Sequence, residues 1–457
     1  MFDHISPSAL RATEFSYLDA AQHVYLDHTG AGLPTREQLR IHAHRLTSGV
    51  YGNPHSQNPA SAASDDLIAR TRAAVLDHFR ADPAEYLVIF TPNATGALRL
   101  VGEAYPFGPH RPLVLLQDNH NSVNGIRAFA RARGARTKSV SLDQPDLRTS
   151  DTTLHAALDG PGGLFAYPAQ SNFTGVRHPL RWIDAAHEAG HDVLLDAAAF
   201  VPSGLLDLSA VHPDFVVVSW YKVFGYPTGV GSLIARREAL ARLRRPWFSG
   251  GTISVASAQV EWHRMSDDES AFEDGTLNFL HIPDVATGLE LIGAVGMDSV
   301  SRHVGELTAV LMDGLRSLTH SSGMPMVRLY GPRTSEGRGG TVALNLLDVH
   351  GNVIDERVVA RDSSARGISL RTGCFCNPGA GEASFGISMQ SLRRAVRNTD
   401  GTMDDYLRQL AMPSGGAVRV SVGLPSNRAD VEAFLAFVLD TYRDSVPDKD
   451  GLAPHRC

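Results

Sequence analysis

Lysine and cysteine are both scarce in this chain. Of its 42 basic residues only Lys138, Lys222 and Lys449 are lysine, and only three of the 457 residues are cysteine. Three thiols are too few for a disulfide framework, which is consistent with a reducing compartment. No apolar run approaches the roughly 20 residues of a membrane span, and the N-terminus lacks a signal-peptide core. We therefore expect a cytoplasmic protein that does not enter membranes.

The sequence also lacks any block of basic residues. Its formal net charge is -7, and the charges are spread along the chain. This distribution argues against nucleic acid or an anionic membrane as a partner. A content of 43% hydrophobic and 20% charged residues is ordinary for a soluble globular protein. At this length we expect two domains.

Residues 86–235 alternate short apolar runs with helical stretches. Continuous apolar strands separated by helices are typical of an α/β fold, in which helices cover both faces of a mostly parallel sheet. The seven expected strands are residues 86–90, 112–116, 137–142, 163–168, 192–196, 214–219 and 229–235. In such sheets ligands bind beyond the carboxyl ends of the strands, so the residues just after each run are candidates for chemistry.

The remaining patterns predict a smaller C-terminal α/β domain. We expect a large domain over residues 24–299, and a small domain that combines an N-terminal arm, residues 1–23, with residues 300–457. The tail from about Val446 is polar, and we predict that it is disordered. The small domain should contain strands at 326–331, 341–347, 368–373 and 417–422 and a helix at 429–442, and the large domain a helix at 64–79.

Lys222 is the most informative of the three lysines. It follows three valines and two aromatic residues, where a charged ammonium would lose hydration at a cost of several kcal/mol. A buried lysine with a lowered pKa is a nucleophilic amine that can form a Schiff base. The alternative is a lysine whose stem packs on apolar surface while its charge reaches water.

Two further strand ends carry groups that suit an anion and a planar ring. Thr95 and Gly96 follow the first strand and open a helix, so N–H groups and a hydroxyl would face a phosphate, unless they only cap the helix. His120 follows the second strand, where a histidine is a candidate proton carrier or a purely structural residue.

Three more strand ends complete the set. Asn172 offers an amide to a polar ligand. Asp196 is followed by three alanines, so its carboxylate needs a cation, such as a protonated pyridine nitrogen. Ser219 precedes Lys222. An anion cradle, a planar group, an acid and an amine at one edge of one sheet are what pyridoxal phosphate requires.

The ordered set resembles a known family. The chain is similar to pyridoxal-phosphate enzymes of fold type I, class V aminotransferase group, and within it to the cysteine desulfurases. It particularly resembles the desulfurase-like N-terminal domain of molybdenum cofactor sulfurases. The resemblance rests on YLDHTGAG (25–32), NPHSQNP (53–59), DNHNSVNGIR (118–127), SWYKVFGYPTGVG (219–231), RTGCFCNPGA (371–380) and RVSVG (419–423).

The resemblance implies a role for each cofactor residue. Lys222 would bind the cofactor aldehyde, Asp196 the pyridinium nitrogen, and His120 would stack on the ring and move protons. Asn172 would contact the cofactor or the substrate, and Tyr221 stands where many desulfurases have a phosphate-binding histidine. The remaining cofactor candidates are Thr95, Gly96, Ser219 and Thr276, the last of which would reach the phosphate of a partner subunit in a homodimer.

The resemblance also implies how sulfur is handled. Arg419 would hold the substrate carboxylate, with Arg371 as a second substrate-binding candidate. Cys376 would attack the sulfur of the substrate and keep it as a persulfide. A free cysteine is otherwise a small buried hydrophobe, and Cys374 with Cys376 would be only half of a metal site, so we predict no metal.

The function that we expect is that of a cysteine desulfurase, which takes sulfur from L-cysteine and releases L-alanine. The alternatives with the same fold are a C–S lyase, a sulfinate-using or decarboxylative enzyme, and an aminotransferase, since fold and cofactor do not fix the substrate. A protein that kept the fold for binding alone is a third possibility. Since few residues follow the helix at 429–442, we expect no C-terminal domain that binds the molybdenum cofactor. The expected partners are therefore the amino-acid substrate, a second copy of the chain, and a sulfur acceptor, protein or cofactor, that the sequence does not identify.

Overall fold

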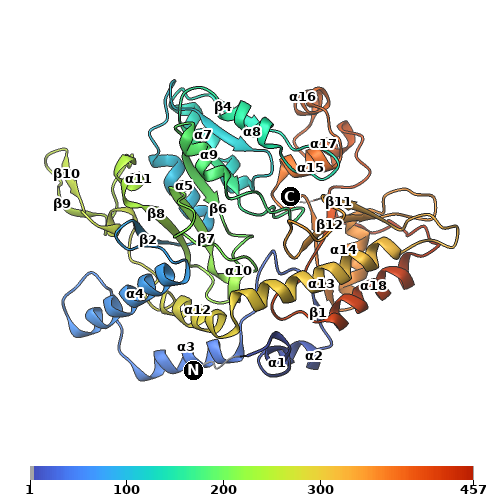
Figure 1. Ribbon diagram of the computed structural model, residues 1–457, viewed down its shortest axis with the longest axis horizontal. Helices are drawn as coiled ribbons and strands as arrows, with labels where there is room; N and C mark the ends of the chain where they lie inside the picture. Colours follow the sequence, from blue (N-terminus) through green and yellow to red (C-terminus); the bar gives the residue numbers. More distant parts are fainter. Residues whose placement is uncertain (1–4, 456–457) are drawn as a thin grey trace.

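All seven strands that the sequence predicts form one sheet. The structure, a computed structural model, describes residues 5–455. The strand order is β2-β8-β7-β6-β5-β3-β4, and only β8 runs antiparallel to its neighbours. The strands are β2 (Tyr86–Thr91), β3 (Leu113–Leu116), β4 (Thr137–Val140), β5 (Leu164–Pro168), β6 (Asp192–Asp196), β7 (Phe215–Ser219) and β8 (Gly231–Arg236) (Figure 1).

This sheet is buried on both faces, as its continuous apolar strands predict. Along β7 the side chains of Val216 and Val218 pack into one core, while Val217 packs into the other. The first core receives helices α4 (Pro59–His78), α9 (Trp182–Glu188) and α12 (Pro283–Val295), and the second receives α5 (Ala94–Ala104), α7 (Ile126–Ala132) and α11 (Arg237–Arg242). The α/β fold class is therefore confirmed.

A second, four-stranded sheet lies in the C-terminal part of the chain. It is antiparallel, with the order β11-β12-β15-β14. Its strands are β11 (Val327–Tyr330), β12 (Thr341–Leu346), β15 (Ala417–Ser421) and β14 (Arg371–Gly373). Helix α13 (Met297–Ser317) runs beside this sheet (Figure 1). The predicted domain boundary at residues 299 and 300 lies in the first turn of α13 and stays a prediction.

The prediction of a single strand over residues 368–373 is wrong. These residues form two strands, because β13 (Ile368–Ser369) pairs with β1 (Val24–Tyr25), whereas β14 pairs with β15. The change of partner has a consequence for the site, since Arg371 of β14 comes to lie directly opposite Arg419 of β15.

The helices largely follow the sequence pattern. Helix α4 begins five residues before its predicted start, because Asn58 caps it and Pro59 occupies its first position. Residues 1–4 of the predicted arm lie outside the described residues. The other helices are α1 (Pro7–Thr13), α2 (Ser16–Ala20), α3 (Arg36–Ser48), α6 (Asn121–Asn124), α8 (Asp151–Leu158), α10 (Trp220–Phe224), η1 (Glu269–Phe272), α14 (Glu356–Ala365), α15 (Pro378–Ser384), α16 (Met389–Asn398), α17 (Met403–Gln409) and α18 (Arg428–Tyr442).

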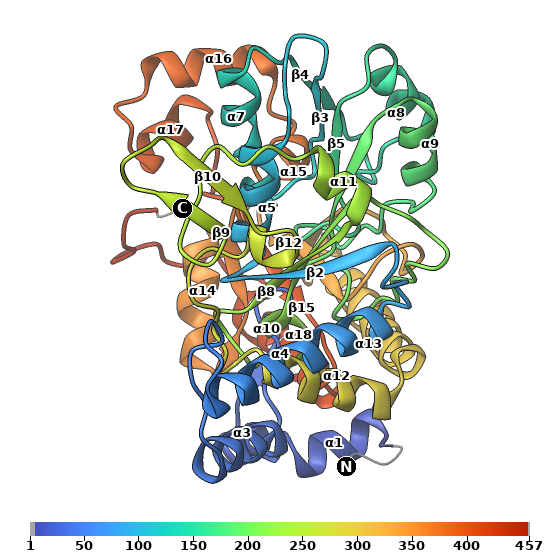
Figure 2. The ribbon, with the colours of Figure 1, turned by 90° about the vertical axis from the view of Figure 1, so that its left-hand side faces the viewer.

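A β-hairpin that the sequence does not predict projects from the large sheet. It consists of β9 (Ile253–Ser257) and β10 (Trp262–Met265), and both strands are mostly exposed. Figure 2 views the molecule from the side on which this hairpin projects. Among residues 5–455, none of the helices combines the length and the apolarity that crossing a bilayer requires.

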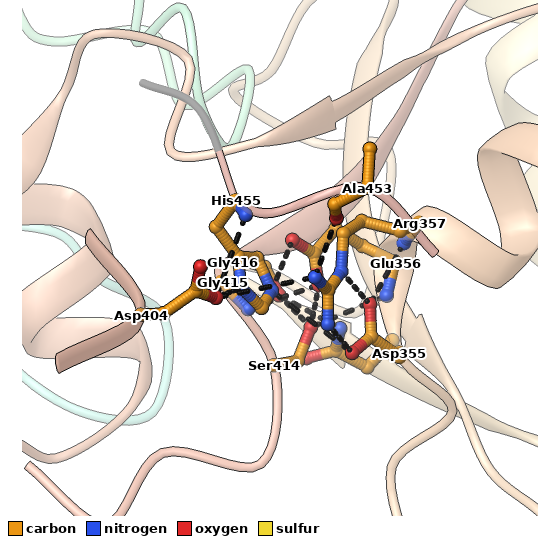
Figure 3. Close-up of polar contacts among 10 residues, drawn as sticks. Asp355, Glu356, Arg357, Asp404, Ser414, Gly415, Gly416, Ala453 and His455 are labelled. Carbon is orange, nitrogen blue, oxygen red and sulfur yellow. Dashed lines mark hydrogen bonds and ion pairs between the residues drawn. The ribbon is translucent and has the colours of Figure 1, made fainter. Parts of the chain in front are cut away.

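The prediction of a disordered tail is wrong for the described residues up to His455. Arg357 donates to the carbonyl of Ala453 at 2.8 Å, and His455 Nδ1 lies 2.5 Å from Asp404 Oδ1 (Figure 3). His455 Nε2 lies 3.3 Å from Glu356 Oε1. The tail docks through hydrogen bonds and ion pairs. Its partners lie far away in the sequence, so its composition alone does not predict this docking.

The docked tail also brings together three side chains of the kinds that bind metal ions. Ligand atoms of Asp355, Glu356 and His455 lie within 4.8 Å of one another. Both oxygens of Asp355 accept N–H groups from the Arg357 guanidinium, at 2.9 and 2.8 Å, and Glu356 accepts from Ser414 and from the backbone of Gly415. These contacts thus form a network in which the Arg357 guanidinium offsets the charge of Asp355, while a hydroxyl and a backbone N–H satisfy Glu356.

Candidate active site

A cavity of about 110 Å³ opens at the carboxyl ends of the large sheet. The strand-end rule applied to the sequence predicts this place. The cavity brings together seven of the predicted site residues: Thr95, His120, Asn172, Asp196, Ser219, Tyr221 and Lys222. They come from five different strand ends.

Lys222 lies in the wall of this cavity on α10, the short helix that follows β7 directly. Burial is the main cause that lowers the pKa of its amine. Asp196 opposes this effect, while the positive charges of Arg419 and Arg371 add to it. A lowered pKa increases the fraction of neutral, nucleophilic amine at neutral pH.

Asp196 is the last residue of β6 and is only 9% exposed. Its Oδ1 accepts the backbone N–H of Ala198 at 3.0 Å, which fixes the carboxylate at the cavity. A buried carboxylate beside a lysine can bind a cationic ring nitrogen without rearrangement.

His120 caps the short helix α6 and faces the same cavity. Its Nδ1 accepts the backbone N–H of Ser122 at 3.1 Å, so in the neutral ring the proton is on Nε2. Burial lowers the pKa of His120, Lys222 and Arg419 lower it further, and Asp196 opposes them. The ring is therefore neutral at physiological pH and can accept a proton.

The phosphate-binding candidates divide between two cavities. The Thr95 hydroxyl lies 2.9 Å from the Ser122 hydroxyl in the Lys222 cavity, and Ser219 also lines it without capping α10. Gly96 and Thr276 instead line a neighbouring cavity of about 420 Å³. The N–H of Gly96 is already bonded to the side chain of Asn93 at 2.9 Å. The structure therefore does not bring Gly96 and Thr276 together with Lys222.

Two arginines meet at one carboxylate beside the Lys222 cavity. Arg371 Nη2 donates to Asp27 at 2.7 Å, and Arg419 Nη2 donates to the other oxygen at 2.9 Å. Burial alone would raise the pKa of Asp27, but the hydrogen bonds and charges of the two arginines lower it below its usual range. Arg419 is only 3% exposed, so Asp27 is its neutralising partner.

Sequence reasoning missed Asp27 and two further residues, Asp118 and Asn377. Asp118 accepts hydrogen bonds from Ser171 at 2.8 Å, from His178 at 2.9 Å and from Asn377 at 2.8 Å. Asp27 and Asp118 both follow strands, and the strand-end rule applied to them would have found both. Asn377 carries no such signal.

The loop of Cys376 connects β14 to α15 at the rim of this cavity. The carbonyl of Cys376 accepts the N–H of Asn121 at 2.7 Å, and Asn121 directly follows His120. The side chain of Asn172, which lines the cavity, donates to the carbonyl of Phe375 at 2.8 Å and accepts from Asn377 at 2.9 Å. Cys376 is exposed.

This loop carries backbone strain. Phe375 and Cys376 both have a φ of 53°, in the left-handed region. Such a residue costs about 1–3 kcal/mol and persists only where its surroundings hold it. Strain of this kind is typical of switch segments and ligand clamps.

The large parallel sheet, with a lysine, a carboxylate and an imidazole in one cavity at its carboxyl edge, defines a protein of the type I pyridoxal-phosphate fold. The sequence assigns the chain to one family within this fold. Residues 24–434 match the aminotransferase class-V family, and the chain belongs to that family.

Individual relatives agree with this assignment. The chain is 38% identical over 465 residues to the human molybdenum cofactor sulfurase, an alignment that covers 96% of this chain and 52% of the relative. It spans 51% to 59% of the length of the curated sulfurases that it matches.

Solved structures share the fold at low identity. An apo cysteine desulfurase from Thermococcus onnurineus NA1 superposes with a TM-score of 0.80 at 22% identity, covering 97% of this chain and 99% of that one. A cystine C–S lyase in complex with its product cysteine persulfide gives a TM-score of 0.72 at 20% identity, covering 94% and 100% of the two chains.

Proposed function

We propose that the protein is a pyridoxal-phosphate-dependent cysteine desulfurase. It takes the sulfur atom of L-cysteine, retains it on Cys376 as a persulfide and releases L-alanine. The observation that carries the proposal is the hydrogen bond from the N–H of Asn121 to the carbonyl of Cys376, because Asn121 directly follows His120, which lines the cavity of Lys222. In the overall reaction one C–S bond breaks, one S–S bond forms, and the thiol proton of Cys376 is balanced by the proton that the alanine methyl group gains.

The residues of the cavity fit the cofactor. Lys222 supplies an amine with a lowered pKa, Asp196 a carboxylate for the ring nitrogen, and Thr95 and Ser219 hydroxyls for the phosphate. Tyr221 lines the same cavity and is a further candidate. When bound, pyridoxal phosphate supplies an electron sink for charge that develops at the substrate Cα.

The chain's own groups perform the proton transfers. Burial lowers the pKa of both His120 and Lys222, which increases the fraction of each that is neutral and able to accept a proton. Arg419 binds the substrate carboxylate with the planar fork that lysine lacks, and Arg371 adds a second positive charge. The Cys376 thiolate then attacks the sulfur of the bound substrate.

We further propose that the protein is a homodimer, in which Thr276 reaches the partner subunit's cofactor phosphate. Thr276 lines the neighbouring cavity rather than the one that contains Lys222. The sulfur acceptor is then a protein or cofactor that reaches the exposed Cys376. The relatives named molybdenum cofactor sulfurases make a molybdenum cofactor one candidate acceptor. A reducing compartment such as the cytoplasm suits this thiol chemistry.

The test is to incubate the purified holoenzyme with L-cysteine and measure alanine and sulfide, with Cys376→Ala beside the wild-type protein. We expect wild-type protein to release alanine and the variant to lose this activity while it keeps its bound cofactor. If Cys376→Ala forms alanine at the wild-type rate, the desulfurase proposal fails. If the variant instead releases free cysteine persulfide from cystine, the protein is a C–S lyase.

A further inference from the structure

Two parts of the candidate site that have separate tasks share one aromatic ring. The ring of Phe375, next to Cys376, lies 4.9 Å from the guanidinium carbon of Arg419. A cation over an aromatic face at this distance is attracted to it. The same ring packs against Phe173 at 5.1 Å and is only 7% exposed. The sulfur-carrying loop therefore rests on the arginine that would bind the substrate carboxylate.

The other polar contacts of Arg419 close it off from solvent. Nη1 donates to the carbonyl of Asn172 at 3.0 Å and Nη2 to Asp27 at 2.9 Å, while Nε is buried and has no hydrogen-bond partner among the described residues. A carboxylate cannot reach this guanidinium unless a covering group moves. Asp27 is bound to Arg371 as well, whereas Phe375 belongs to a loop.

The ring that covers Arg419 stands on a strained segment of the chain. Phe375 and Cys376 are held in left-handed conformations, and Gly373, with a φ of 107°, precedes them. Asn172 gives a second link, because its carbonyl accepts from Arg419 while its amide donates to the carbonyl of Phe375. Asp27 is shared by Arg371 and Arg419, so the pair of arginines keeps one excess positive charge. A substrate carboxylate at Arg419 would offset this charge, which weakens the attraction to the ring. The strained backbone is then free to relax.

We propose that Phe375 is a positioning residue that couples occupation of Arg419 to the position of Cys376. Without substrate, the ring rests on the guanidinium and Cys376 stays at the rim of the cavity. When a substrate carboxylate binds, the ring leaves Arg419 and the loop carries Cys376 towards the substrate sulfur. This inference rests on the proposed function, and it makes substrate binding the signal that releases the thiol.

The test is the alkylation rate of Cys376 by iodoacetamide in the holoenzyme, measured by mass spectrometry of its peptide with and without L-alanine. L-alanine carries the carboxylate but no sulfur. In wild-type protein we expect L-alanine to lower the rate roughly two- to fivefold, because the loop carries the exposed Cys376 towards the cavity. Phe375→Leu should be alkylated at the same rate in both conditions, and Phe375→Tyr, which keeps a ring, should respond like wild type. Phe385→Leu is the matched control, because Phe385 follows α15 and packs on Tyr330, not on Arg419.

Two results would overturn the coupling: no effect of L-alanine on the wild-type rate, or a Phe375→Leu variant that keeps the full response. The wild-type comparison needs no variant, so it decides even if Phe375→Leu does not fold. Persulfide formation from L-cysteine, measured in the same wild-type preparation, separates the two proposals. If persulfide forms on Cys376 but L-alanine has no effect, only the coupling fails; if no persulfide forms, the proposed function fails.

Discussion

The two halves of the candidate site are built in opposite ways. The groups that would hold the cofactor stand at the ends of buried parallel strands, where the sheet fixes Asp196, Ser219 and Lys222. The thiol that would carry the sulfur is exposed and stands on a loop with two left-handed residues. A cofactor must be bound in one geometry, whereas a sulfur carrier must reach both a substrate and an acceptor. The fold thus combines a preorganised cavity with a strained segment beside it.

Removing the amine of Lys222 should have the largest effect on activity. We expect Lys222→Ala to lower alanine release from L-cysteine roughly 10²–10⁴-fold, because both the covalent anchor and a base are lost. Lys449→Ala, in the exposed tail, should keep the wild-type rate. A Lys222→Ala variant with more than a tenth of wild-type activity would show that the reaction does not depend on the Lys222 cavity.

Replacing the thiol of Cys376 should stop sulfur transfer without affecting cofactor binding in the cavity. Cys376→Ser should abolish persulfide formation, while the absorbance of the bound cofactor stays that of the wild-type protein. Cys374→Ser, two residues earlier, should retain most of the activity. Equal losses in the two variants would mean that the loop acts through its fold and not through the thiol of Cys376.

Removing the carboxylate that joins the two arginines should cost stability. Asp27→Asn leaves Arg419 buried without its neutralising partner, so we expect the free energy of unfolding to fall by about 3 kcal/mol. Urea denaturation measures this change. Asp66→Asn, which breaks an exposed pair with Arg70, should change it by no more than about 1 kcal/mol. Similar values for the two variants would contradict the role of Asp27.

Acid should lower the free energy of unfolding through His28. This residue lines a small cavity with Lys222 and is packed against Gly423, and burial lowers its pKa to about 3 although Asp27 opposes the shift. Below its usual pKa of 6.5 the unfolded chain binds a proton that the folded protein does not. Stability should therefore fall with acidification, by up to about 1.4 kcal/mol per pH unit from this group.

The control for this effect is His28→Gln, which cannot titrate. Urea denaturation at a series of pH values below 6.5 should show a shallower loss of stability for the variant. The same slope in both proteins would show that His28 is protonated in the folded state.

The sequence predicts the cavity half far better than the loop half. The runs of β6 and β7 are strands because nearly all of their residues are buried on both faces, so Asp196 and Lys222 could be placed from local pattern alone. Asp27 and Arg419 are 392 residues apart, and their meeting depends on the bridge between Asp27 and Ser421 of β15, which no local pattern specifies. For the same reason the docked tail and the ring of Phe375 over Arg419 could not be predicted.

The central claim is that the amine of Lys222 and the thiol of Cys376 act on one substrate. The most direct measurement is the mass of the Cys376 peptide after incubation with L-cysteine in the absence of reductant, in wild-type protein and in Lys222→Ala. We predict the added mass of one sulfur atom on wild-type Cys376 and none in the variant. An unmodified wild-type peptide, or equal modification of both proteins, would contradict the account.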